Sequence, residues 1–263
     1  MTSYFVICIA SLLVAGLTMY SGFGLGTLLM PVFALFFPLE LAVAATAVVH
    51  SANNIFKISL VGKFADRRLV LSFGVPALLA AFAGAAALGY VAQFGELATW
   101  SLGTRQATIT PLKLAMGLLM LVFALCELLP RLRKLRIDQR WLVPGGLLSG
   151  FFGGFSGHQG ALRSAFLTKV GISPQAFVGT NAVIGFMVDT ARIATYAVIF
   201  TQTDSTRTIE AAQWPLVLAA ILAAFAGVRL GRRFLTKVTM ESIQTLTGAL
   251  LLLIALTLSL GLL

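Results

Sequence analysis

Long apolar runs, separated by short polar stretches, follow one another along the whole chain. Six of these runs are long enough for an α-helix to cross a hydrocarbon core of about 30 Å, which takes roughly 20 residues. The six runs are Leu39–Val61, Leu69–Ala92, Thr110–Leu129, Ser173–Phe200, Trp214–Leu230 and Ser242–Leu263. The pattern therefore predicts an all-α polytopic membrane protein.

Four shorter apolar runs form two pairs, and each pair meets at a glycine-rich break. The runs are Tyr4–Tyr20, Phe23–Phe37, Leu142–Phe155 and Ala161–Val170. At 1.5 Å per residue several of them are too short for a full crossing. We therefore predict a helical hairpin or broken helix over residues 4–37 and a second over residues 142–170, and whether they cross the bilayer stays open. No Lys or Arg precedes the first run, so we expect a retained membrane segment and not a cleaved signal peptide.

Composition agrees with a membrane protein and excludes other classes. Of the 263 residues, 59% are hydrophobic and 11% are charged, whereas a soluble domain is about half apolar and a quarter charged. The polar stretches are too short to fold as a catalytic or receptor domain. The net charge of +10 fits basic cytoplasmic loops better than nucleic-acid binding. Cys8 and Cys126 lie inside apolar runs without metal-ligand spacing, and we predict no metal and no cofactor.

The basic residues indicate the orientation of the chain. Twelve of the nineteen Lys and Arg residues cluster in three loops, which we predict to be cytoplasmic because short cytoplasmic loops are enriched in these residues. The three groups are Lys63, Arg67 and Arg68; Arg131, Arg133, Lys134, Arg136 and Arg140; and Arg229, Arg232, Arg233 and Lys237. The intervening loops then face outward, and both chain ends are predicted outside.

A weak internal repeat divides the chain into two halves. A shift of 134 residues superposes Gly16 on Gly150, Gly26 on Gly160, Leu28 on Leu162, Ala42 on Ala176 and Thr46 on Thr180. The segment "LAAFAG" occurs at residues 79–84 and again at residues 222–227. We predict a first repeat over residues 1–129, a basic cytoplasmic linker over residues 130–140 and a second repeat over residues 141–263. Because the first begins outside and the second inside, the repeats have inverted topology, as in many secondary transporters.

The two glycine-rich breaks, "SGFGLG" and "GGFSGHQG", occupy equivalent places in the two halves. A helix that begins at such a break leaves free backbone N–H groups and a positive dipole end inside the membrane, where an anion would satisfy them. Arg163 adds a planar cationic fork suited to an oxyanion. The alternative is that the glycines only allow close helix packing. The predicted binding residues of the breaks are Gly22, Gly24, Gly26, Ser156, Gly157, His158, Gln159, Gly160 and Arg163.

Other polar side chains lie inside the predicted spans, where they usually face a pathway or the bundle interior. His50, Asn53 and Asn54 fall within about one turn of each other, and interhelical hydrogen bonds are the alternative to a pathway role. In the matching span of the second half, we place Thr180 and Asn181 near the middle and add both to the binding residues, with Asn53.

Two further groups carry predictions about gating. Asp189 and Arg192 are three residues apart on one helical face, so we predict that they pair, either as a clamp or as a gate. His50, Asp189 and Arg192 are the candidates for coupling or gating, and His158 is a further group able to change its protonation. Lys57 is expected near the cytoplasmic end of its span, where its side chain can reach the interface.

These features resemble the TauE/SafE sulfite exporter family of membrane permeases. The resemblance rests on the two breaks, on "SGFFGGFSGHQGALRSAFL" with the following "GISPQAFVGTNAVI", and on "FPLELAVAATAVVHSANNIFK" in the first half, and it covers about residues 15–231. It implies transport of sulfite, sulfonates or similar sulfur-containing anions across the bacterial inner membrane, coupled to an ion gradient. The first break departs from the family pattern in reading "GFGLGT", and the second contains His158, Gln159 and Arg163 where small residues are common.

We therefore predict a proton-coupled secondary transporter of a small anion that works by alternating access. The alternatives are a passive anion channel, a membrane enzyme and an assembly protein. The sequence contains no HExxH motif and no arrangement typical of a nucleophilic triad, which disfavours the enzyme. The expected partners are a small anion and the lipid bilayer, and a homodimer is left open.

Overall fold

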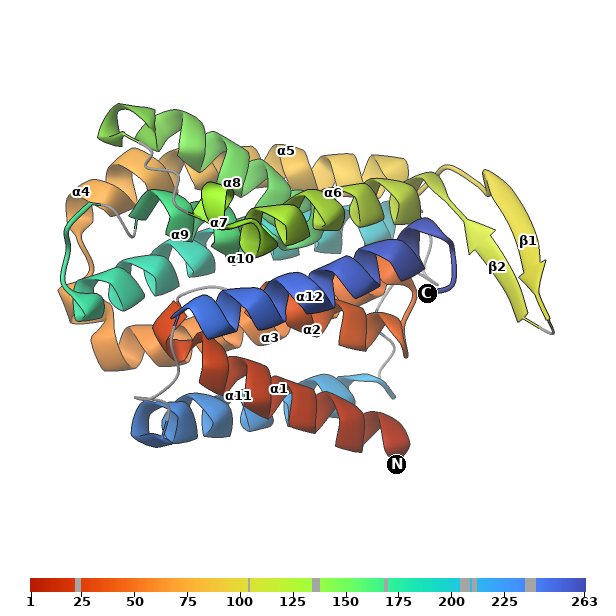
Figure 1. Cartoon of the computed structure of the whole chain (residues 1–263), viewed down its shortest axis with the longest axis horizontal. Coiled ribbons are helices and arrows are strands. Elements are labelled where there is room, and N and C mark those ends of the chain that lie inside the picture. Colours follow the sequence, from red (N-terminus) through yellow and green to blue (C-terminus); the bar gives the residue numbers. More distant parts are fainter. Residues whose placement is uncertain are drawn as a thin grey trace.

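The computed structural model describes residues 1–21, 25–103, 105–133, 138–167, 170–203, 209, 212–234 and 240–263. Within these residues the fold is a bundle of helices (Figure 1). Helices long and apolar enough to cross a membrane account for most of the chain. The prediction of an all-α polytopic membrane protein is therefore confirmed.

The first half of the chain contains α1 to α7 and a β-hairpin. Asp66 caps the start of α4 by accepting a hydrogen bond from the Leu69 amide at 3.0 Å, and Thr110 caps α6 in the same way through the Lys113 amide. The elements are α1 (Thr2–Ser21), α2 (Leu25–Ala34), α3 (Leu39–Val61), the 3₁₀ turn η1 (Gly62–Phe64), α4 (Arg67–Leu69), the π-helical turn η2 (Val70–Gly74), α5 (Val75–Val91), β1 (Ala98–Leu102), β2 (Arg105–Ile109), α6 (Pro111–Leu128) and α7 (Pro130–Arg133).

The second half follows the same order of helices without a β-hairpin among its described residues. Its elements are the 3₁₀ turn η3 (Gln139–Trp141), α8 (Leu142–Ser156), α9 (Gln159–Leu167), α10 (Pro174–Thr203), α11 (Trp214–Phe234) and α12 (Met240–Ser259). The short helix α9 thus follows α8 directly, as α2 follows α1.

Most of the predicted spans form helices, with two differences at the chain ends. Five of the six long runs coincide with helices that satisfy the length and hydropathy of a span. In the sixth, Ser242–Leu263, the apolar helical part runs from Gln244 to Ser259. The run Tyr4–Tyr20, which we grouped with the short runs, belongs to the 20-residue helix α1, which is long enough to cross. That grouping was wrong, because the helix extends beyond the run at both ends.

The long helices pack in pairs that join the two halves. Gly146, Gly150 and Gly154 of α8 lie directly against the backbone carbonyls of Phe73, Ala77 and Ala81, so a side chain at any of them would overlap the neighbouring backbone. Since both series advance by four residues in the same direction, α5 and α8 run parallel. On the other side of the bundle, Gly227 and Gly231 of α11 lie against the carbonyls of Leu12 and Gly16 of α1 in the same way.

The remaining pairs are antiparallel. Gly117 of α6 lies against Ala255 and Ser259 of α12, whereas Gly248 of α12 lies against Leu128. In the centre, α3 packs against α10, because Gly179 of α10 meets the Val61 carbonyl and Gly185 meets Asn54. Figure 1 shows both chain ends at the same end of the molecule as the β-hairpin, and α4 at the opposite end.

The β-hairpin was not predicted, because residues 93–106 were treated only as a polar loop. Its strands are antiparallel, with Trp100 opposite Ala107. It contacts the end of α12, since the Trp100 indole Nε1 donates to the Leu260 carbonyl at 2.9 Å and the Thr108 amide donates to the Gly261 carbonyl at 3.2 Å. The hairpin therefore covers the end of the α6–α12 pair.

The close packing of α5 on α8 makes a prediction about Gly150. Replacing Gly150 with alanine should lower the free energy of unfolding by about 1–3 kcal/mol, because the new Cβ meets backbone atoms of Ala77 that cannot rotate away. This cost exceeds the helix-propensity gain of about 1 kcal/mol. Thermal unfolding of the detergent-purified protein measures the effect, and Gly95→Ala is the control, since nothing lies within 4 Å of that position. Equal stability of the two variants would contradict the packing.

Candidate functional site

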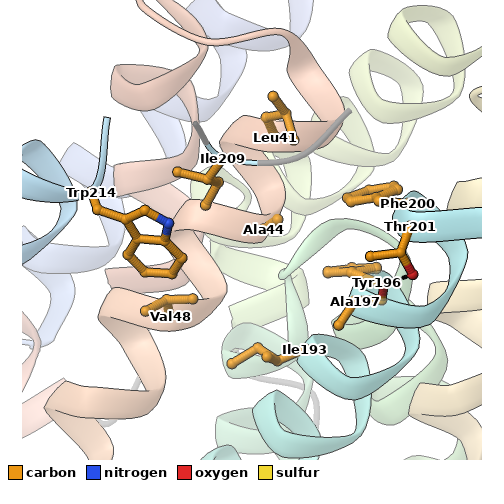
Figure 2. A pocket seen from close by; sticks show the side chains of 10 residues that line it. All are labelled: Leu41, Ala44, Val48, Ile193, Tyr196, Ala197, Phe200, Thr201, Ile209 and Trp214. Atoms are coloured by element: carbon orange, nitrogen blue, oxygen red, sulfur yellow. Dashed lines mark hydrogen bonds between the residues drawn. The ribbon is translucent and has the colours of Figure 1, made fainter. Parts of the chain in front are cut away.

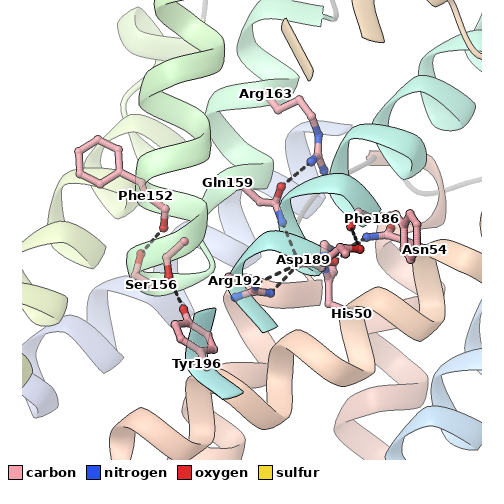
Figure 3. Close-up of polar contacts among 12 residues, drawn as sticks. His50, Asn54, Phe152, Ser156, Gln159, Arg163, Phe186, Asp189, Arg192 and Tyr196 are labelled. Carbon is pink, nitrogen blue, oxygen red and sulfur yellow. Dashed lines mark hydrogen bonds and ion pairs between the residues drawn. The ribbon is translucent and has the colours of Figure 1, made fainter. Parts of the chain in front are cut away.

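A network of polar side chains lies where α3, α9 and α10 meet in the interior (Figure 3). At its centre is the Asp189 carboxylate, which is fully buried. Its Oδ2 lies 2.6 Å from His50 Nδ1 and accepts a hydrogen bond from Asn54 Nδ2 at 3.0 Å. An ionised carboxylate only accepts hydrogen bonds, so Nδ1 of His50 carries the hydrogen in this contact. Two side chains of α3 are thus bound to a single oxygen of α10.

The other carboxylate oxygen of Asp189 is held by a second pair of side chains. Oδ1 accepts hydrogen bonds from Gln159 Nε2 and from Arg192 Nε, both at 3.0 Å, and Arg192 Nη2 lies 2.8 Å away. The predicted pairing of Asp189 with Arg192 is therefore confirmed. Gln159 begins α9, so this carboxylate connects that helix to α3 and α10.

Arg163 extends the network along α9. Its Nη1 donates to Gln159 Oε1 at 2.9 Å, one helical turn away, and its Nε donates to Asn181 Oδ1 at 2.6 Å. Asn181 in turn donates through Nδ2 to the Phe177 carbonyl at 2.9 Å. Gln159 accepts from a cation through its oxygen and donates to a carboxylate through its nitrogen, so the orientation of its amide is fixed by both neighbours.

Positive charge exceeds negative charge in this interior. Arg163 and Arg192 are both buried, and Asp189 is the carboxylate that the network contains. With a neutral His50, the network carries a net charge of about +1. Lys57 adds another buried cation nearby, and its Nζ donates to the Thr18 carbonyl near the end of α1 at 3.3 Å. The prediction that Lys57 reaches the interface was wrong, because the carbonyls at the C-terminal end of α1 accept its charge inside the bundle.

The two helix breaks meet next to this network. A Cβ atom at Gly26, in the first turn of α2, would lie 3.1 Å from the Gly157 carbonyl and 3.8 Å from the His50 ring. Gly157 has a positive φ of 82°, which ends α8 and lets α9 begin after one further residue. A Cβ at Gly157 would lie 2.9 Å from Arg192 Nη1. Within the described residues, Nη1 of Arg192 is buried and forms no hydrogen bond.

The glycines of the second break have two different roles. Gly154 packs against α5, and Gly153 would contact Gln159 and Val188 if it had a side chain. Gly157 instead permits the reversal of the chain. Gly160 is buried in the first turn of α9. Both interpretations of the glycine-rich run, close packing and a helix break, therefore apply to it at different positions.

His158 and Ser156 face away from the Asp189 network. The His158 ring stacks on Phe123 of α6, with centroids 5.5 Å apart, and its Nδ1 lies 2.9 Å from Ser156 Oγ. Ser156 Oγ donates to the Phe152 carbonyl at 2.9 Å. Nε2 of His158 is buried without a hydrogen bond to any described residue.

Other predicted site residues are not brought into the network. Thr180 lies in the second turn of α10, where its hydroxyl accepts a hydrogen bond from the Asp66 amide at 2.8 Å. Its predicted place near the middle of the span was wrong, since α10 extends to Thr203. The Asn53 carboxamide is buried with no hydrogen bond among the described residues. Gly22 and Gly24 lie outside the described residues.

Sequence reasoning missed two members of the site. Asn54 contacts Asp189, although we selected its neighbour Asn53; the spacing of four residues from His50 puts Asn54 on the same helical face and was the available signal. Tyr196 is buried one turn beyond Arg192, and its hydroxyl donates to the Gly154 carbonyl. Among the described residues, no three His, Cys, Asp or Glu side chains lie together as a metal site would require.

The fold and this buried network define a multi-pass membrane protein with a charged centre enclosed by apolar helices. The family model described as Sulfite exporter TauE/SafE matches residues 7–258, and the chain belongs to this family. It is a family of membrane transporters and not of enzymes, and membership implies a small anionic substrate. The resemblance seen in the sequence is thereby confirmed. No curated protein and no solved structure matches the chain.

Proposed function

We propose that this protein is a secondary active transporter that moves sulfite, a sulfonate or a similar sulfur-containing anion across the bacterial inner membrane, coupled to protons. The observation that carries the proposal is the meeting of the two breaks at Gly26 and Gly157, beside Arg192 and the Asp189 network. Discontinuous helices that meet inside the bundle are typical of the substrate sites of secondary transporters.

The chemistry of this meeting point favours an anion. The first turns of α2 and α9 have backbone N–H groups without partners inside their own helices, and their dipoles place positive potential there. Nη1 of Arg192 is a buried cationic donor without a hydrogen bond among the described residues, and it lies beside Gly157. We assign the substrate to this position, between Gly26, Gly157 and Arg192, with Gln159, Arg163 and Asn181 holding the surrounding charge.

Proton coupling is assigned to His50 and Asp189. They lie 2.6 Å apart, and both can change their protonation. A proton on Asp189 would weaken its bonds to His50, Asn54, Gln159 and Arg192 together, and so would loosen α3 and α9 from α10. In this proposal the ion pair of Asp189 with Arg192 is a gate, which an anion and a proton open in combination.

Alternating access follows from the predicted relation between the two halves, residues 1–129 and 141–263, joined by the linker 130–140. Exchanging the halves converts the parallel pair α5 and α8 into the parallel pair α11 and α1, which pack with the same glycine-to-carbonyl contacts. The pairs α3 with α10 and α6 with α12 are each converted into themselves. This symmetry supports inverted repeats.

The orientation that we propose places both chain ends outside. The chain ends lie at one end of the molecule, and α4, which follows the basic loop with Lys63, lies at the other (Figure 1). Basic loops are enriched on the cytoplasmic side. The parallel course of α1 and α11 agrees with this arrangement, since both would run from outside to inside.

A flux assay tests the proposal. Purified protein in vesicles should take up labelled sulfite at a rate that saturates with concentration, and an inward proton gradient should change the rate of uptake. Collapse of the gradient with a protonophore is the control. A flux that does not saturate and ignores the gradient would identify a passive channel, and no flux of any anion would overturn the transport assignment.

A further inference from the structure

A largely apolar pocket lies between α3 and α10, beside the segment that joins α10 to α11 (Figure 2). Its volume is about 250 Å³. Leu41, Ala44 and Val48 of α3 line one wall, and Ile209 and Trp214 contribute from beyond α10. The α10 wall consists of Ile193, Tyr196, Ala197, Phe200 and Thr201.

The hydroxyl groups of the α10 wall are already engaged within the protein. Thr201 Oγ1 is 2.7 Å from the Ala197 carbonyl, to which it donates, and the Tyr196 hydroxyl donates to the Gly154 carbonyl on α8. The aliphatic and aromatic surfaces that remain favour an apolar occupant, because a polar group placed there would lose its hydrogen bonds to water.

The pocket adjoins the charged network on both of its helices. Tyr196 is one turn from Arg192, roughly 6 Å along the helix axis, and Val48 precedes His50 by two residues. The Tyr196 ring is 2% exposed and stacks on Phe200, with centroids 5.7 Å apart. This one aromatic residue therefore lies between the pocket and Arg192.

We propose that the pocket binds the apolar part of an organic anion whose acidic group is bound at Arg192. The inference rests on the proposed function and narrows its substrate class, because inorganic sulfite has no part that could fill the pocket. An apolar cavity of about 150 Å³ accommodates a benzene ring, so this pocket has room for a ring or a short alkyl chain. The continuity with a network of excess positive charge argues for an anion over a lipid acyl chain.

A series of sulfonates tests this assignment on the full chain in lipid nanodiscs. Methanesulfonate, butanesulfonate and hexanesulfonate carry the same acidic group and differ in apolar length. We expect the affinity, measured by calorimetry, to rise by about fourfold for each added CH₂ group that enters the pocket. Hexanol, which has the chain without the charge, should bind at least tenfold more weakly than hexanesulfonate.

Two matched variants locate the effect. Ala197 lines the pocket, whereas Ala194, one turn earlier on α10 and also exposed, does not. Ala197→Leu should reduce the ratio of hexanesulfonate to methanesulfonate affinity by tenfold or more, and Ala194→Leu should leave it unchanged. Ala44→Leu fills the pocket from α3 and provides a second variant if Ala197→Leu does not fold.

The outcomes separate this inference from the proposed function. Binding of methanesulfonate with no gain from a longer chain would overturn the pocket assignment and leave the anion site intact. Equal binding of hexanol and hexanesulfonate would identify a lipid site and also overturn it. A gain that survives both pocket-filling variants would place the chain elsewhere. Failure of every sulfonate and of sulfite to bind the wild type would overturn the proposed function itself.

Discussion

Replacing Arg163 with alanine is expected to weaken anion binding by on the order of 100-fold or more, without preventing membrane insertion. Truncating one member of a buried, hydrogen-bonded charged network costs about 2–5 kcal/mol, and Arg163 supplies a positive charge together with bonds to Gln159 and Asn181. Its loss leaves Asp189 and Arg192 as an ion pair with no excess positive charge to attract an anion. Calorimetry with the purified protein and sulfite measures the affinity.

Two variants control this result. Arg68→Ala removes the same charge from an exposed cytoplasmic position and should bind as the wild type does. Arg163→Lys keeps the charge but loses the planar fork, so it should bind with an affinity between the wild type and Arg163→Ala. Retained affinity in a folded Arg163→Ala protein would remove Arg163 from the site and leave it a structural role.

Replacing Asp189 with asparagine should abolish the dependence of transport on a proton gradient and should change substrate affinity less. Asparagine keeps the shape of the side chain but cannot take up a proton, and it leaves Arg192 without a charged partner. Breaking a buried ion pair in this way costs about 3–5 kcal/mol, so the apparent melting temperature should fall as well. Uptake into vesicles between about pH 5 and pH 8 and thermal unfolding measure the two effects.

A second substitution separates the gate from a clamp. In Asp189→Asn with Arg192→Gln no unpaired charge remains, so much of the stability should return while the pH response stays absent. Asp138→Asn, at an exposed carboxylate of the linker, is the control and should alter neither property. A pH profile identical to that of the wild type in Asp189→Asn would reduce the ion pair to a clamp.

The helices could be predicted from the sequence because a membrane span is set by length and hydropathy, which are local properties. The hairpin over Ala98–Ile109 escaped notice, although Thr99, Trp100 and Ser101 alternate with small or apolar neighbours around the turn at Gly103. In a chain dominated by long apolar runs, such a short polar segment gives little contrast. Its position against the end of α12 depends on tertiary contacts.

Much of the candidate site was also predictable, but its connections were not. The spacing of Asp189 and Arg192 fixes their pairing on a single helix. The contact of Asp189 with His50 joins residues 139 apart in the sequence, and no local pattern contains it. Lys57 shows the same limit, since only the position of α1 explains why its charge stays inside the bundle.

The contacts between glycine and carbonyl groups restrict how the molecule can change shape. α5 belongs to the first half and is tightly joined to α8 of the second, and α11 is joined to α1 in the same manner. A rocking motion that keeps these joints intact cannot separate residues 1–129 from residues 141–263. The mobile units are therefore interwoven, each built from helices of both repeats, and the hinge between them passes along α3 and α10, where the charged side chains lie.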